Sequence, residues 1–106
     1  MRLSKNEIDV INKLARKYFG NDTEVSLFGS RADDSKKGGD IDLFIQSKQK
    51  EKLTVENKIL FKTDLILLIG EQKIDVILDN ASLRETSFYG SIKRHSIALW
   101  HGWKTG

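Results

Sequence analysis

The sequence predicts a small α/β (α+β) domain in which helices pack on one mixed β-sheet. Three observations favour this class: two segments carry apolar residues at helical spacing, short apolar runs alternate with those segments, and only about a dozen residues join the first two runs. A link that short does not hold the helix of a parallel crossover, so the sheet should be mixed. At 106 residues, the chain is expected to form one domain spanning residues 1–106.

The first helix is predicted to begin after Ser4, which opens a Ser-x-x-Glu capping box with Glu7. A single helical face then carries the apolar residues Ile8, Ile11, Leu14, Ala15 and Tyr18. A Gly-Asn-Asp segment from Gly20 ends this helix. Residues 25–28 are apolar and are expected to form a buried strand that stops at Gly29.

The middle of the chain predicts a strand, a helix and a second strand after a polar loop. The loop covers residues 30–39, and the strand that follows it covers residues 41–45. A helix from about residue 50 to 69, charged at first and then heavily apolar, ends at a glycine. It is long enough for a right-handed crossover into a third strand at residues 73–78.

The end of the chain predicts a last helix and an edge strand. Ser82 begins a second Ser-x-x-Glu pattern, from which we expect one helix that packs through Leu83, Phe88 and Ile92. Residues 96–100 could then close the sheet as an edge strand.

The composition excludes several functional classes. Eighteen basic and fifteen acidic side chains give a net charge of +3 with both signs mixed along the chain, which favours a solvated surface over a nucleic-acid-binding one. The absence of cysteine excludes disulfides and thiolate zinc sites. Because no apolar run is long enough to span a bilayer and residues 1–20 lack a signal-peptide core, we expect no membrane association and a cytoplasmic location.

Three aspartates interrupt apolar strands, where an ionised carboxylate is costly unless something neutralises it. Asp40 and Asp42 lie on either side of Ile41, so they point to one face of their strand. Asp75 interrupts the third strand and joins them if the two strands are neighbours. Oxygen ligands of this kind favour Mg²⁺, and three clustered acids are the scaffold of two-metal phosphoryl chemistry.

Gly29 and Ser30, at the end of the first strand, predict a phosphate-binding turn. A glycine lets the backbone approach a ligand closely, and a following helical turn offers free N–H groups. Ser30 adds a hydroxyl donor, and Arg31 could supply charge to a triphosphate, although an exposed structural arginine is an equal alternative. Gly38 and Gly39 would let the loop close over the site.

A simpler interpretation exists for each acid alone. Asp40 can be a loop residue, Asp42 can face solvent on a half-exposed sheet, and Asp75 can pair with a lysine. The three acids together with the Gly-Ser turn favour the metal site. His95 and His101 have no acidic partner nearby in the sequence and are interpreted as surface residues.

The spacing Gly29-Ser30, nine residues, then Asp40-Ile41-Asp42-Leu43, with Ile74-Asp75-Val76 downstream, resembles the signature of the DNA polymerase beta-like nucleotidyltransferase superfamily. The size is similar to that of its minimal nucleotidyltransferases, which are often encoded beside a helical HEPN-domain protein. The resemblance implies a palm-like fold. It also implies that Asp40, Asp42 and Asp75 hold Mg²⁺, with two ions expected, while Gly29 and Ser30 bind the triphosphate of ATP.

The resemblance further implies transfer of AMP from ATP to an acceptor hydroxyl, with Asp75 as general base. The acceptor would lie on a HEPN-type toxin, which makes this chain the antitoxin of a toxin–antitoxin system. Two alternatives stay open: an antitoxin that binds nucleotide and acts by contact without transfer, and a homodimeric small-molecule nucleotidyltransferase. In the second, Trp100 and Trp103 would lie at the interface, although they could equally cap the core.

Overall fold

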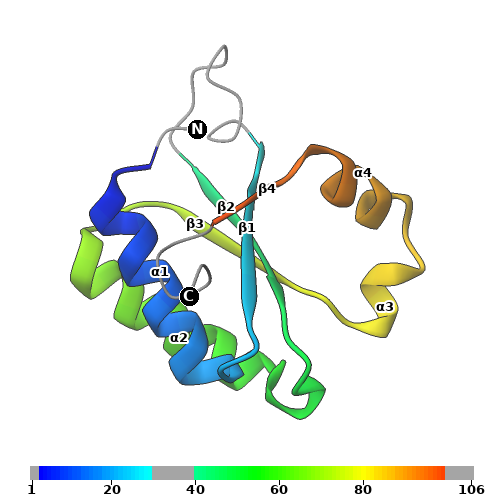
Figure 1. The fold of residues 1–106 in the computed structure, drawn as a ribbon, viewed down its shortest axis with the longest axis horizontal. Coiled ribbons are helices and arrows are strands. Elements are labelled where there is room, and N and C mark those ends of the chain that lie inside the picture. The colour runs from blue at the N-terminus through cyan, green and yellow to red at the C-terminus, as the bar shows by residue number, and fades with distance from the viewer. Residues whose placement is uncertain (1–2, 30–39, 100–106) are drawn as a thin grey trace.

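The structure is a computed structural model that describes residues 3–29 and 40–99. It contains the predicted mixed sheet, with helices on both of its faces (Figure 1). In chain order the elements are α1 (Lys5–Phe19), β1 (Glu24–Phe28), β2 (Ile41–Gln46), the 3₁₀ turn η2 (Lys50–Lys52), α2 (Val55–Ile69), β3 (Ile74–Leu78), α3 (Ala81–Arg84), α4 (Ser87–His95) and β4 (Ile97–Ala98).

The sheet has the strand order β3-β2-β1-β4. Strand β2 pairs antiparallel with β1 and parallel with β3, and β4 pairs antiparallel with the outer side of β1. The prediction of a mixed sheet is therefore confirmed, and the second and third strands are neighbours, the condition under which Asp75 joins the other acids. Helix α2 makes the crossover between those two parallel strands, as the sequence indicated.

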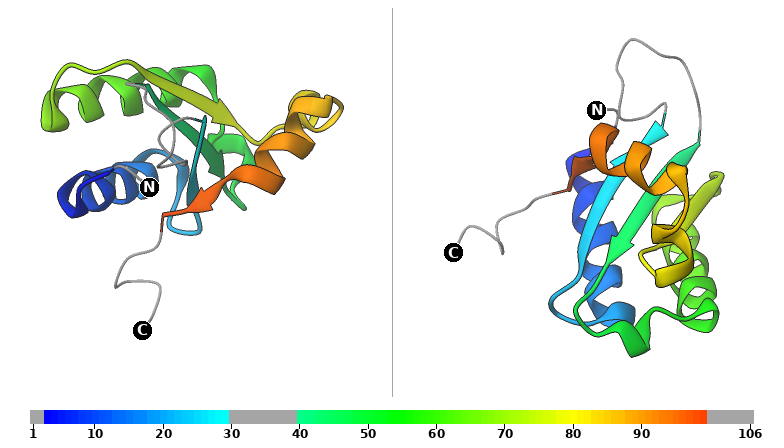
Figure 2. Two further views of the ribbon diagram at one scale, coloured as in Figure 1. Left: turned by 90° about the horizontal axis from the view of Figure 1, so that it is seen from above. Right: turned by 90° about the vertical axis from the view of Figure 1, so that its right-hand side faces the viewer.

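The two faces of the sheet have different roles. Helices α1 and α2 cover one face, and α3 and α4 lie on the other (Figure 2). Alternate residues of each strand enter the core beneath α1 and α2, where Phe19, Phe61 and Leu65 are fully buried. The strands supply Val25, Leu27, Ile41, Leu43, Ile45, Ile74, Val76 and Leu78 to this core. The remaining strand positions, including both strand aspartates, therefore belong to the opposite face.

Helix α1 begins and ends where the sequence predicted. The Ser4 hydroxyl accepts a hydrogen bond of 3.1 Å from the Glu7 amide, and the Ser4 amide donates one of 2.9 Å to the Glu7 carboxylate. At the other end Gly20 has φ 105°, a conformation that favours glycine. The predicted apolar face is buried at Ile11, Leu14 and Ala15.

The prediction of one continuous helix from about residue 50 to 69 was wrong. The short 3₁₀ turn ends at Leu53, and α2 starts after Thr54, whose hydroxyl accepts a 3.1 Å hydrogen bond from the Asn57 amide. A threonine hydroxyl competes for backbone donors in this way and favours a helix start over a helix interior.

The predicted last helix is also divided, and Ser82 does not cap it. Asn80 caps α3 through a 2.9 Å hydrogen bond from the Leu83 amide, and Thr86 caps α4 through a 3.3 Å bond from the Tyr89 amide. Two good capping residues therefore outcompete the Ser-x-x-Glu pattern. Of the three residues expected to pack, Ile92 is buried and Leu83 partly buried, but Phe88 is 47% exposed.

The expected edge strand at residues 96–100 is shorter in the structure. Strand β4 covers Ile97–Ala98, and the next amide, that of Leu99, donates a 2.8 Å hydrogen bond to the Val25 carbonyl. Trp100, His101 and Trp103 lie outside the described residues. Within the described residues, no helix combines the length and apolarity needed to cross a membrane.

Candidate active site

Asp42 and Asp75 lie side by side on the two central parallel strands. The register pairs Asp42 of β2 directly with Asp75 of β3. Each follows a buried isoleucine, Ile41 or Ile74, so both side chains project from the face opposite α1 and α2. Asp40 directly precedes β2, two residues from Asp42, and is partly buried. The structure thus brings together the strand acids that the sequence singled out.

Gly29 brings the main chain of β1 against the same carboxylates. Phe28, the last residue of β1, pairs in register with Asp42. Gly29 has φ +77°, and a Cβ atom built on it would lie 2.2 Å from the Asp42 Oδ2 atom. A side chain does not fit in that space, and the positive φ itself favours glycine. In the structure Gly29 therefore lies against a carboxylate, and its role in phosphate binding stays a prediction.

The remaining predicted nucleotide-binding residues cannot be placed. Ser30, Arg31 and Gly39 lie outside the described residues, between Gly29 and Asp40. Their proposed roles therefore stay predictions from the sequence. His95 lies at the end of α4 and is exposed, as expected for a surface histidine.

The carboxylates of this cluster repel one another. Partial burial raises the pKa of Asp42 above its ordinary value, and the neighbouring negative charges of Asp75 and Asp40 raise it further. Lys73 acts in the opposite direction and lowers it. The Lys73 ammonium lies 3.7 Å from the Asp40 carboxylate, but both side chains are substantially exposed, so this pair compensates only part of the negative charge.

The chemistry of this cluster suits a metal ion, although only Asp42 and Asp75 lie side by side and Asp40 contacts Lys73 instead. Within residues 3–29 and 40–99, no three histidine, cysteine, aspartate or glutamate side chains are grouped closely enough to hold a metal ion. Asp40 contacts Lys73, whereas Asp42 and Asp75 face each other across neighbouring strands. Asp42, whose pKa is raised, and the adjacent Asp75 present carboxylate oxygens whose negative charge a hard divalent cation would stabilise. The residues present therefore fit Mg²⁺, with Asp42 and Asp75 as the pair that would hold it.

A second charged cluster, which the sequence analysis missed, lies at the other end of β2 and β3. Asp79 follows β3 and is 1% exposed, and Arg84 donates to its two carboxylate oxygens at 2.8 and 2.9 Å. Gln46 donates to it at 3.3 Å, and the Lys50 ammonium lies 3.9 Å away. The hydrogen bond from Arg84 holds the pKa of Asp79 below its ordinary value. This carboxylate is therefore ionised and already well satisfied.

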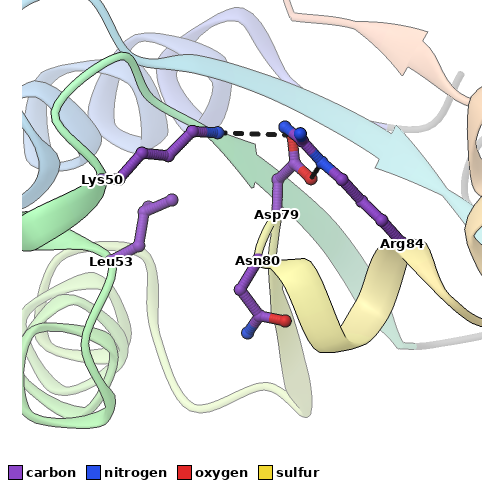
Figure 3. A pocket seen from close by; sticks show the side chains of 5 residues that line it. All are labelled: Lys50, Leu53, Asp79, Asn80 and Arg84. Atoms are coloured by element: carbon purple, nitrogen blue, oxygen red, sulfur yellow. Dashed lines mark hydrogen bonds and ion pairs between the residues drawn. The ribbon is translucent and has the colours of Figure 1, made fainter.

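Asp79, Lys50 and Arg84 line a pocket of about 430 Å³ together with Leu53 and Asn80 (Figure 3). The figure shows Lys50 and Arg84 reaching Asp79 from opposite sides, one from η2 and the other from α3. This cluster connects α3 to the end of the sheet. Asp79 and Arg84 are five residues apart, a spacing that matches no helical or strand pattern, so the sequence offered no signal for the pair.

An open mixed sheet with two adjacent aspartates on its central strands, beside a glycine turn, has the architecture of a nucleotidyltransferase-like fold. Residues 8–99 match the family described as "Nucleotidyltransferase domain", and the chain belongs to that family. No curated protein matches the sequence.

Two solved structures are similar in fold. One is a crystal structure of a toxin-antitoxin with AMP-PNP, with a TM-score of 0.63 and 19% identity over 92% of this chain and 76% of that one. The other is a mutant of the toxin-antitoxin MntA-HpeT, with a TM-score of 0.62 and 19% identity over 97% of this chain and 77% of that one. At this identity the likeness concerns the fold.

Proposed function

We propose that the protein transfers AMP from ATP to a hydroxyl group on a HEPN-type toxin partner and so acts as an antitoxin. The observation that carries the proposal is the pairing of Asp42 with Asp75 beside the Gly29 turn, in a chain of the nucleotidyltransferase domain family. The fold neighbours support its finer parts, because one is described with AMP-PNP and both are toxin-antitoxin structures.

In the proposed reaction, the acceptor oxygen attacks the α-phosphorus of ATP. The new O–P bond forms as the bond to the oxygen that bridges the α- and β-phosphates breaks, and pyrophosphate leaves with that electron pair. The acceptor proton passes to the carboxylate of Asp75, the general base. The Gly29 backbone and the Ser30 hydroxyl would bind the triphosphate, Arg31 would supply positive charge to it, and Gly39 would let the loop close over it.

The aspartates position the reacting groups. Asp40, Asp42 and Asp75 would hold Mg²⁺, two ions in the full site, which supplies charge neutralisation at the phosphoryl oxygens and lowers the pKa of the attacking hydroxyl. Asp40 must leave Lys73 to join its neighbours, which a side-chain rotation on the exposed edge allows. Lys73 is then free to face the added negative charge of the triphosphate.

The surface of α2 also supports the proposal of a protein partner. Five large apolar side chains of this helix are 45–76% exposed, namely Val55, Ile59, Leu60, Leu67 and Leu68. A monomer rarely leaves so many on one helix uncovered, and contact with another protein is the common explanation. Because α2 covers the face opposite the acids, this surface supports binding of a protein partner and not the placement of the acceptor hydroxyl at the acids.

The proposal is tested by incubating the protein with Mg²⁺, ATP and a HEPN-type protein encoded beside it. We expect label from α-phosphate-labelled ATP on the partner and none from γ-labelled ATP. Asp42→Asn should abolish the labelling, whereas the matched control Asp22→Asn, in the exposed turn after α1, should not. Suppression of the toxin without label would identify the contact-only antitoxin instead. Label on a small molecule but not on the toxin would identify a homodimeric small-molecule nucleotidyltransferase instead.

A further inference from the structure

Two phenylalanine rings lie beside the aspartates on the same face of the sheet. Phe28 is the direct register partner of Asp42, so the Cβ atoms of these two residues are about 5 Å apart across the antiparallel pair. Phe88 of α4 lies against Phe28 with ring centroids 6.0 Å apart and an interplanar angle of 74°. The rings therefore border the carboxylates on the side away from β3, because β1 and β3 flank β2 on opposite sides.

The Phe88 side chain is not required to hold α4 in place. Helix α4 is already anchored by Ile92, which is buried, and by Tyr89, whose ring packs edge-on against the buried Phe44 at 6.1 Å. Phe88 adds a further aromatic contact but leaves 47% of its surface in solvent. A large apolar ring that is half exposed at the edge of a polar site is a surface available to a flat ligand.

We propose that the exposed ring of Phe88, held edge-to-face against Phe28, forms the stacking surface for the nucleobase of the substrate. The inference rests on the proposed function, in which Gly29 binds the triphosphate and the acids would hold it through Mg²⁺. A nucleotide held there must place its base to one side of the acids. The β1 and α4 side offers the aromatic surface. Stacking on an aromatic ring does not read hydrogen-bonding groups, so the site accepts any base and holds the larger purines more tightly.

The proposal separates binding of the base from binding of the phosphates. In the presence of Mg²⁺, the protein should bind ATP more tightly than inorganic tripolyphosphate, and GTP more tightly than UTP. Phe88→Leu keeps an apolar side chain but removes the ring, and it should weaken ATP binding roughly 10-fold while leaving tripolyphosphate binding unchanged. Phe88→Trp should retain or strengthen ATP binding.

Isothermal titration calorimetry measures these dissociation constants directly. Thr63→Ala is the control, because Thr63 is exposed on α2, on the opposite layer and outside its apolar surface, and its change should affect neither ligand. Thermal melts verify that each variant is folded, and Phe28→Leu provides a second removal of a ring should Phe88→Leu unfold.

The possible results are distinguishable. Equal binding of ATP and tripolyphosphate by the unaltered protein, or equal loss of both in Phe88→Leu, would overturn the stacking surface and leave the proposed function standing. Binding of neither ligand would overturn the proposed function as well. A selective loss of ATP binding that Phe88→Trp restores would support the inference.

Discussion

Replacing Gly29 by alanine tests whether this turn sets the geometry of the acids. Gly29 has φ +77°, a region that costs an alanine about 1–2 kcal/mol. For a domain of this size, that loss of stability lowers Tm by roughly 5–10 °C. Gly70 is a matched control, since it has φ +97° with nothing within 4 Å of an added Cβ. Gly70→Ala should therefore lose similar stability through backbone strain alone.

The two variants should differ in ligand binding. The alanine Cβ at position 29 would lie 2.2 Å from Asp42 Oδ2, so this oxygen must move by about 1 Å to reach ordinary contact. A misplacement of that size costs on the order of 100-fold in a positioned site. We expect Gly29→Ala to lose that factor in transfer rate and at least 10-fold in Mg²⁺–ATP affinity, while Gly70→Ala keeps both.

Transfer assays and calorimetry on folded protein, monitored by circular dichroism, make the comparison. If Gly29→Ala transferred AMP as well as Gly70→Ala at equal stability, the approach of β1 to Asp42 would have no part in the chemistry. The reasoning that ties the turn to the acids would then be refuted.

Three further predictions concern single charges. The pKa of Asp42 is raised in the folded state, so its ionised form destabilises the metal-free fold as the pH rises above 3.8, the ordinary pKa of an aspartate. Asp42→Asn should therefore flatten the fall in Tm between pH 4 and 7, and it should also remove the stabilisation by Mg²⁺. Arg84→Met leaves the Asp79 charge buried with fewer hydrogen-bond donors, so it should lower the free energy of unfolding in urea by roughly 3 kcal/mol at pH 7. This loss should shrink below pH 3.8, because Asp79 becomes protonated as the pH falls through its lowered pKa. Lys93→Met, at an exposed site on α4, should cost almost nothing. Lys73→Met should change the Mg²⁺ dissociation constant by less than about 5-fold, toward tighter binding, since an exposed ion pair is weak; a loss of binding would mean that Lys73 supports the site directly.

The sheet could be predicted because strand patterns carry the information locally. Ile41 and Leu43 alternate with Asp42, and Ile74 and Val76 alternate with Asp75, so the face of each acid follows from period two. A helical crossover of the right length then places the two strands in parallel, but the sequence left their adjacency as a condition, which the structure meets.

Other features could not be predicted, because they depend on competition between helix and cap positions or on contacts between residues far apart in the sequence. Thr54 and Thr86 could each have been a helix residue or a cap, and in the structure each accepts a hydrogen bond as a cap. The ion pair of Asp79 with Arg84 depends on α3 lying at the end of the sheet, so the spacing of the two residues in the sequence does not predict it. The contact of Phe88 with Phe28 joins α4 to β1 across 60 residues and was likewise out of reach of local patterns.

The arrangement of the two faces explains how the strands tolerate their aspartates. The core that stabilises the fold lies under α1 and α2, where Leu43 and Val76 are buried while the neighbouring acids point away from them. Asp42 therefore loses only part of its hydration, and the cost of its charge falls on the face opposite the core. Substitutions that relieve the repulsion, such as Asp42→Asn, can then stabilise the fold while removing its chemistry. This opposition of stability and activity at one residue is expected of a catalytic acid and would be absent from an aspartate that merely faces solvent.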